Sequence, residues 1–172
     1  MKIVIPWSRT TPRFAASGAD SRHTRTSAVC FSQTVKKEKD IYNESANARA
    51  EIKEALARAA ADHKRVIVVF GANWCYDCHV LDKAFHSPDL APILAANYEV
   101  VHVDIGKGEK NQDLMAKYEV PMKGGIPGLA VLDPDGKLVY SQKNGEFENA
   151  LALAPEDFRA FLNRWKPGAQ SR

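Results

Sequence analysis

The feature that most constrains the fold is an apolar run that leads directly into a pair of cysteines. Residues 66–70 are five consecutive apolar residues, most of them β-branched, which is typical of a central strand buried on both faces of a sheet. Gly-Ala-Asn at 71–73 predicts a turn, and Trp-Cys-Tyr-Asp-Cys-His follows at 74–79. A helix is predicted from Cys75 to about His86. The sequence therefore predicts a buried strand that turns into a helix, with two cysteines at the junction.

The rest of the chain alternates between helical and strand patterns. An amphipathic helix is predicted over residues 45–63, where apolar residues recur at helical spacing. Ser87 and Pro88 predict the N-cap and the first helical position of a short helix over residues 89–97. The other predicted elements are strands over residues 99–104, 128–132 and 137–141 and helices over residues 111–118 and from Pro155 onward.

The predicted strands are expected to form a mixed sheet. Strands separated by a helix favour parallel pairing, because a parallel connection needs a crossover. Asp-Pro-Asp-Gly at residues 133–136 predicts a type I turn, which adds an antiparallel hairpin at the edge. We therefore expect an α/β fold with a central sheet of four to five strands, flanked by helices.

The N-terminal region differs in composition from the rest of the chain. Residues 1–40 hold eight Lys or Arg and three Asp or Glu, so the remainder of this chain of net charge +3 is mildly acidic. No basic stripe remains to meet nucleic-acid phosphates. We assign residues 1–42 to a flexible basic extension, 43–168 to one domain and 169–172 to a short tail. No apolar run reaches the roughly 20 residues of a membrane span.

The cysteine pair with its following histidine has three possible chemical uses. It could form a reversible disulfide, supply half of a metal site, or attach a c-type haem. Haem would need a second axial ligand, for which Met115 and Met122 are available. The strand predicted at residues 66–70, directly before the motif, does not fit a small helical cytochrome. Zinc would need two further ligands. Cys30 lies in the extension, and His86 and His102 are not paired at ligand spacing, so we expect no metal site.

A disulfide exchange reaction fits the spacing of the cysteines. Cys75 is expected at the first turn of a helix, where free N–H groups and the helix dipole stabilise a thiolate. Cys78 lies one turn later, close enough to attack a mixed disulfide formed by Cys75. Cys75 would then be the attacking cysteine and Cys78 the resolving one.

These motifs resemble the thioredoxin family over roughly residues 45–166. The resemblance rests on Trp-Cys-x-x-Cys at a strand-to-helix turn and on Ile126-Pro127 before the next central strand. Phe85-His86-Ser87 and the strand ending at Asp104 are most similar to bacterial thioredoxin-like proteins related to thiol–disulfide interchange domains. The resemblance implies a thioredoxin-like fold.

The resemblance also implies roles for residues around the cysteines. In the family, the proline matching Pro127 is cis and lies against the disulfide. The backbone of the preceding residue, here Ile126, pairs with the substrate strand, and the tryptophan matching Trp74 flanks the active site. We therefore expect Trp74, Tyr76, Ile126 and Pro127 to bind substrate.

Two departures from the family pattern concern proton transfer and redox potential. Thioredoxins carry a buried Asp at the position of Val69 and a Lys at the position of Val100, so their proton-transfer route is in doubt here. Asp77 places a carboxylate beside the cysteines, which disfavours a neighbouring thiolate. We expect a weakly to moderately reducing or isomerising couple, tuned by Asp77 and by His79. Asp82, one turn beyond Cys78, is a candidate proton relay through water.

The sequence thus predicts a thiol–disulfide oxidoreductase that uses the Cys75–Cys78 pair and needs no other cofactor. Its expected partners are protein thiols or disulfides and an upstream electron donor, and we expect a monomer. The alternative is a non-catalytic binding module that presents the groove near Ile126-Pro127. The related bacterial proteins are mostly exported to the cell envelope, but no export signal can be recognised in the sequence, so the compartment stays open.

Overall fold

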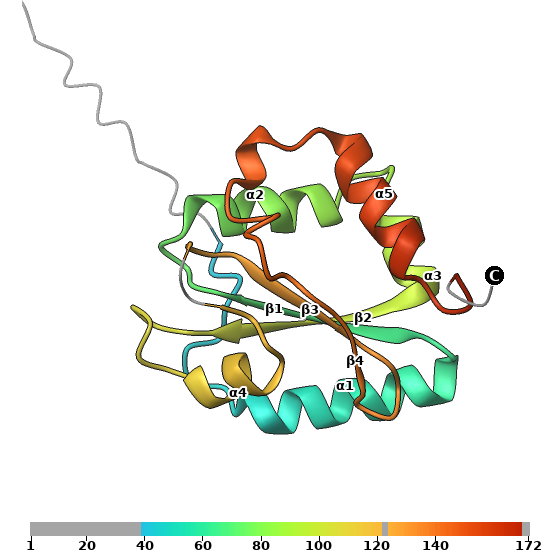
Figure 1. Ribbon diagram of the computed structural model, residues 1–172, viewed down its shortest axis with the longest axis horizontal. Helices are drawn as coiled ribbons and strands as arrows, with labels where there is room; N and C mark the ends of the chain where they lie inside the picture. Colours follow the sequence, from blue (N-terminus) through green and yellow to red (C-terminus); the bar gives the residue numbers. More distant parts are fainter. Residues whose placement is uncertain (1–38, 122–123, 170–172) are drawn as a thin grey trace, which may run out of the picture. The chain divides into compact units, whose positions relative to one another are not determined.

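The computed structural model describes residues 39–121 and 124–169, and these form one sheet covered by helices (Figure 1). The strands are β1 (Arg65–Gly71), β2 (Tyr98–Asp104), β3 (Gly128–Leu132) and β4 (Leu138–Ser141). The helices are α1 (Ala48–Asp62), α2 (Tyr76–Phe85), α3 (Ala91–Asn97), α4 (Gln112–Lys117) and α5 (Pro155–Trp165), with a short 3-10 helix, η1 (Ala150–Ala152).

The sheet is mixed and has the strand order β2-β1-β3-β4. β1 pairs parallel with β2 on one side and antiparallel with β3 on the other, and β3 pairs antiparallel with β4. The N–H of Gly136 donates to the carbonyl oxygen of Asp133 (2.8 Å) and closes the predicted turn between β3 and β4. The predicted mixed sheet, with four strands, is therefore confirmed.

Strand β1 divides the core into two apolar layers. All seven of its residues are buried, as the apolar run predicted. Val66, Val68 and Phe70 point toward α1 and α4, where they join one cluster of buried residues. Ile67 and Val69 point to the opposite face, where α2, α3 and α5 cover the sheet (Figure 1). Because both faces are covered, β1 is buried along its whole length up to the turn that follows it.

The predicted start of one helix was wrong. We expected a helix from residue 89 with Pro88 in its first turn, but α3 begins at Ala91. The carbonyl oxygen of Ser87 accepts hydrogen bonds from Leu90 N (3.1 Å) and Ala91 N (2.9 Å), so the preceding residues form a turn. Pro92 occupies the first turn of α3, where its missing N–H leaves no hydrogen bond unmade.

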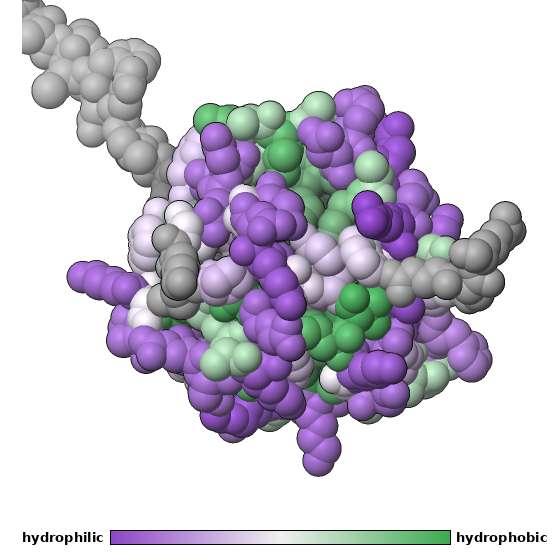
Figure 2. Space-filling view, viewed as in Figure 1, coloured by the Kyte–Doolittle hydropathy of each residue, from purple (hydrophilic) through white to green (hydrophobic). Residues whose placement is uncertain are grey.

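The face of the molecule shown in Figure 2 is mostly hydrophilic, with hydrophobic residues in separate small patches. The bulk of the apolar side chains lies instead in the two layers on either side of the sheet. Within residues 39–121 and 124–169, no helix combines the length and the apolar character needed to cross a membrane.

Candidate active site

The two cysteines lie where β1 turns into α2. Cys75 is the N-cap of α2, and its Sγ accepts a hydrogen bond from the backbone N–H of Cys78 (3.1 Å). Cys78 lies one turn into the helix, and a disulfide joins the two residues with their Cα atoms 5.3 Å apart. The helix dipole and the free N–H groups of the first turn favour a negative charge at Cys75 Sγ. This is the geometry that the cysteine spacing predicted.

Ile126 and Pro127 complete the surroundings of the disulfide. Their peptide bond is cis, as the resemblance implied, and Cys75 Sγ lies 3.5 Å from the carbonyl oxygen of Ile126. The buried side-chain amide of Gln142 donates to the carbonyl oxygen of Pro127 (3.1 Å) and so holds the backbone at Ile126-Pro127 in place. A backbone carbonyl group therefore lies next to the sulfur that is expected to attack.

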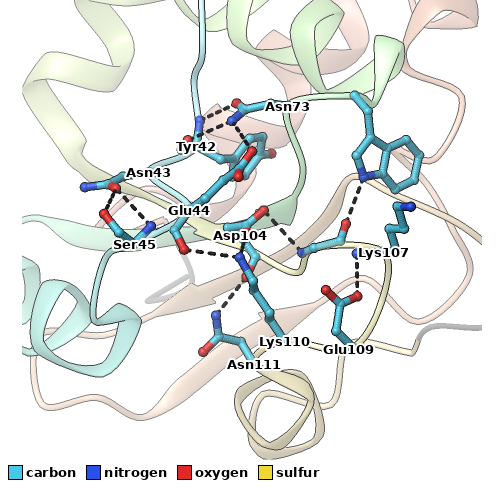
Figure 3. A network of polar contacts seen from close by, with 12 residues as sticks. Tyr42, Asn43, Glu44, Ser45, Asn73, Asp104, Lys107, Glu109, Lys110 and Asn111 are labelled. Carbon is cyan, nitrogen blue, oxygen red and sulfur yellow. Dashed lines mark hydrogen bonds and ion pairs between the residues drawn. The ribbon is translucent and has the colours of Figure 1, made fainter.

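Two exposed aromatic side chains flank Cys75 in the sequence. Trp74 is 65% exposed and Tyr76 is 62% exposed, so both can meet a partner. The indole Nε1 of Trp74 donates to the carbonyl oxygen of Gly106 (2.8 Å), which ties this side chain to the loop after β2. That loop is held in turn by Asp104, which accepts hydrogen bonds from Lys110 Nζ (2.8 Å) and Gly106 N (3.2 Å) (Figure 3).

Asn73, which the sequence pattern predicts only as part of a turn, ties a preceding segment of the chain to the cysteines. Its Oδ1 accepts hydrogen bonds from Ile41 N (3.0 Å) and Tyr42 N (2.9 Å), and its Nδ2 donates to Tyr42 O (2.9 Å) (Figure 3). Tyr42 is buried and packs against Cys75 and Cys78. Ile41 and Tyr42, which precede the domain start that we predicted at residue 43, therefore belong to the surroundings of the cysteines.

Comparisons with known proteins identify the family. A family model described as Thioredoxin-like matches residues 47–134. The chain belongs to the thioredoxin-like family. A solved structure, described as a disulphide isomerase from Xylella fastidiosa Temecula1, is 37% identical, with a TM-score of 0.69 over 73% of this chain and 95% of that one. A thioredoxin from Thermus thermophilus is 25% identical, with a TM-score of 0.51 over 69% of this chain and 88% of that one.

A curated relative is much longer than this chain. The thiol:disulfide interchange protein DsbD of Pseudomonas fluorescens is 29% identical over 126 residues, which are 72% of this chain and 19% of that protein. The chain thus spans about a fifth of the length of this relative. The thioredoxin-like family and the disulfide at Cys75–Cys78 are thus established for this chain itself.

The predicted tuning residues of this thioredoxin-like site contact neighbouring backbone. Asp77 is partly buried, and its Oδ1 accepts a hydrogen bond from Leu151 N (3.0 Å), which links α2 to η1. His79 is also partly buried, and its Nε2 lies 2.8 Å from the carbonyl oxygen of Asn73. Both side chains therefore hold the segments that surround the cysteines, and their influence on the redox potential stays a prediction.

A histidine lies beside the position where thioredoxins carry a buried acid. Val69 is 1% exposed, and the strand register places it opposite His102 on β2, whereas Val100 lies opposite Ile67. His102 Nε2 is 3.5 Å from Asp82 Oδ1. Burial lowers the pKa of the His102 imidazole below its ordinary value, and the Asp82 carboxylate opposes that shift. The candidate relay Asp82 thus contacts His102.

Of the side chains considered as alternative haem or zinc ligands, Met115 lies away from the cysteines. Met115 is buried in the layer between the sheet and α1, on the side opposite α2. Cys30 and Met122 lie outside the described residues, as does most of the predicted extension. Within residues 39–121 and 124–169, no group of three or more His, Cys, Asp or Glu side chains is placed to hold a metal ion.

Proposed function

We propose that this thioredoxin-like protein reduces or exchanges disulfides in protein substrates through Cys75 and Cys78. The observation that carries the proposal is the position of Cys75 Sγ at the N-terminus of α2, beside the backbone carbonyl of Ile126 and the cis proline. The helix start favours a thiolate, and the half-exposed Ile126 beside it could offer backbone groups to an extended substrate. The Cys75–Cys78 pair serves as the redox group, with no further cofactor.

The reaction has two exchange steps. The Cys75 thiolate attacks one sulfur of the substrate disulfide, forms a mixed disulfide and releases the other substrate sulfur as a thiolate. Cys78 then attacks Cys75 Sγ, which closes the Cys75–Cys78 disulfide and releases the second substrate sulfur. Two electrons have passed to the substrate, so a dithiol donor must return two electrons to the protein before the next cycle.

The names of the relatives support this reaction class. The structure that is 37% identical is called a disulphide isomerase, and the curated relative is called a thiol:disulfide interchange protein. An isomerase needs Cys75 to attack and then leave again, whereas a reductase needs Cys78 to complete the second step. The same two cysteines serve both reactions, and the redox potential decides which of them dominates.

Asp77 favours a reducing or isomerising couple. Its carboxylate lies in the first turn of α2, between the two cysteines in sequence. A negative charge there disfavours a neighbouring thiolate, and strong oxidants depend on a stabilised thiolate. Equilibration with glutathione is expected to give a potential of about −180 to −270 mV, the range that isomerases and thioredoxins span, and a value near −120 mV would overturn this assignment.

Reduction of insulin by dithiothreitol tests the proposed activity. The wild-type protein is expected to accelerate the reaction, Cys75→Ser to abolish the acceleration, and Cys30→Ser, the matched control, to leave it unchanged. Equal acceleration by Cys75→Ser and wild type would contradict the proposal. Binding of insulin without turnover would favour the non-catalytic module instead. Sedimentation of the same samples tests the expected monomer.

A further inference from the structure

Tyr42 carries a buried hydroxyl group beside the two cysteines. The residue is 2% exposed and shares one buried cluster with Cys75 and Cys78. Within the part of the chain that the structure describes, its Oη has no hydrogen-bond partner. A buried hydroxyl group without a partner costs free energy that a phenylalanine at the same place would not. The presence of a tyrosine here therefore has a reason other than packing.

The Tyr42 hydroxyl group and the Cys78 sulfur both lie close to Gly71, the last residue of β1. A Cβ atom added to Gly71 would overlap the Tyr42 hydroxyl group and would lie 2.7 Å from Cys78 Sγ. Both atoms therefore border the small space that the glycine leaves free. The hydroxyl group therefore lies close to the resolving cysteine, although the two atoms form no hydrogen bond while Cys78 is in the disulfide.

Tyr42 is held in place by contacts to its backbone and to its ring. Asn73 binds both the backbone N–H and the carbonyl oxygen of Tyr42 (Figure 3). The imidazole of His102 packs against the phenol ring edge-on, with the ring centroids 5.3 Å apart. A side chain held in this way can present a hydroxyl group to Cys78 without losing further freedom when the disulfide opens.

We propose that Tyr42 is a positioning residue for the resolving step, in which its hydroxyl group donates a hydrogen bond to the reduced Cys78 sulfur and stabilises the thiolate. The inference rests on the proposed function, because a resolving step exists only if the pair turns over. The Cys78 proton passes to the substrate thiolate released in the first step. The Cys78 sulfur then bonds to Cys75 Sγ, and the electron pair of the mixed disulfide leaves with the second substrate sulfur.

The charges around Tyr42 keep it protonated, as a donor must be. Burial raises the pKa of the phenol above its ordinary value, and the negative charges of Asp82 on α2 and Asp104 on β2 raise it further. Lys110 pairs with Asp104, and His102 is the other titratable group against the ring. Tyr42 therefore keeps its own proton throughout the reaction.

A neutral donor also suits the apolar surroundings of this site. Val69 stands where thioredoxins carry a carboxylate, and it is buried among apolar residues. A hydrogen bond to the charged form of a thiol lowers the pKa of that thiol. Tyr42 can provide this bond without adding a second buried charge beside Cys78.

The resolving step can be measured separately from the first attack with an aromatic disulfide, 5,5′-dithiobis(2-nitrobenzoate). The protein is the full-length chain with Cys30→Ser. Attack by Cys75 releases one thionitrobenzoate, and resolution by Cys78 releases the second. In Tyr42→Phe we expect the second release to slow about tenfold at neutral pH and its pH midpoint to rise by about one unit, with the first release unchanged. The control Tyr98→Phe removes a buried hydroxyl group that bonds to Leu162 O, far from the cysteines.

A second measurement supports or overturns the inference independently of rates. Loss of the hydrogen bond destabilises the reduced form only, so Tyr42→Phe should shift the equilibrium with glutathione about tenfold toward the disulfide form. An unchanged pH midpoint and equilibrium in Tyr42→Phe, or equal shifts in Tyr98→Phe, would overturn the inference. Release of only one thionitrobenzoate by the Cys30→Ser protein would instead contradict the proposed function itself.

Discussion

The side chain of Asn73 binds the backbone of Tyr42 in both directions, accepting from its N–H and donating to its carbonyl oxygen at 2.9 Å each. Asn73 directly precedes the Trp-Cys-x-x-Cys segment, and Tyr42 lies under the disulfide. The side-chain amide of Asn73 therefore connects the turn before the cysteines to the backbone of the segment that contains Tyr42. Changes at Asn73 should consequently affect Tyr42 before they affect the rest of the fold.

Replacing Asn73 by Ala tests this coupling. The variant leaves the partly buried N–H groups of Ile41 and Tyr42 without acceptors, so the free energy of unfolding should fall by about 1–3 kcal/mol. Urea denaturation measures this loss, and faster amide exchange at Tyr42 would locate it. Asn43→Ala is the matched control. The exposed side chain of Asn43 accepts hydrogen bonds from the neighbouring Ser45, so this variant should stay within about 0.5 kcal/mol. Equal losses in the two variants would refute the coupling.

Gly71 should be intolerant of a side chain. A methyl group there would overlap the Tyr42 hydroxyl group and approach Cys78 Sγ, so Gly71→Ala should destabilise the protein by about 1–3 kcal/mol. Combining it with Tyr42→Phe removes part of the overlap and should recover some of the loss. A double-mutant cycle by denaturation measures this coupling, and strictly additive effects would show that the two residues do not share the space.

Replacing Trp74 should change the kinetics with protein substrates more than the free energy of unfolding. Its ring is 65% exposed, so Trp74→Ala should change the free energy of unfolding by less than about 1 kcal/mol. The lost apolar surface should raise KM for insulin several-fold and leave the reaction with a small disulfide, such as hydroxyethyl disulfide, nearly unchanged. Steady-state kinetics with both substrates check this difference. A parallel loss with both substrates would assign Trp74 to the chemistry instead.

His102 should make stability depend on pH. Because burial lowers its pKa in the folded protein, the unfolded chain binds a proton on this imidazole at higher pH than the folded protein does. This contribution to stability is complete above about pH 6.5 and is lost as the pH falls toward the folded-state pKa. Replacing His102 by Gln should therefore flatten the decline in unfolding free energy below pH 6.5. A decline of unchanged slope would contradict the assignment.

Much of the fold could be predicted because it depends on local patterns. Residues 66–70 are apolar on both faces of β1, and the structure covers both faces of that strand. The turn at residues 133–136 and helix α2, which Cys75 caps, also depend on neighbouring residues alone. The predicted start of α3 was wrong because Pro88 and Pro92 both suit a first helical turn. The hydrogen bonds that Ser87 O accepts place a turn at Pro88, and α3 starts at Ala91.

The surroundings of the cysteines could be predicted only in part. Cys75, Cys78 and the cis Pro127 follow from motif and resemblance. Tyr42 and Asn73 do not, because their contact joins residues 31 positions apart and neither belongs to a periodic pattern. An asparagine in a turn is common for local reasons alone, so only the folded chain shows which distant backbone it binds.

The central claim, that Cys75 attacks and Cys78 resolves, is tested most directly by trapping the mixed disulfide. Reduced Cys78→Ser and Cys75→Ser proteins, both in the Cys30→Ser background, are mixed with a disulfide-bonded protein and analysed by intact mass. We predict a covalent, thiol-sensitive adduct at Cys75 in Cys78→Ser, little adduct in Cys75→Ser, and no accumulation when both cysteines are present. Equal adduct yields in the two variants, or none in Cys78→Ser, would contradict the account.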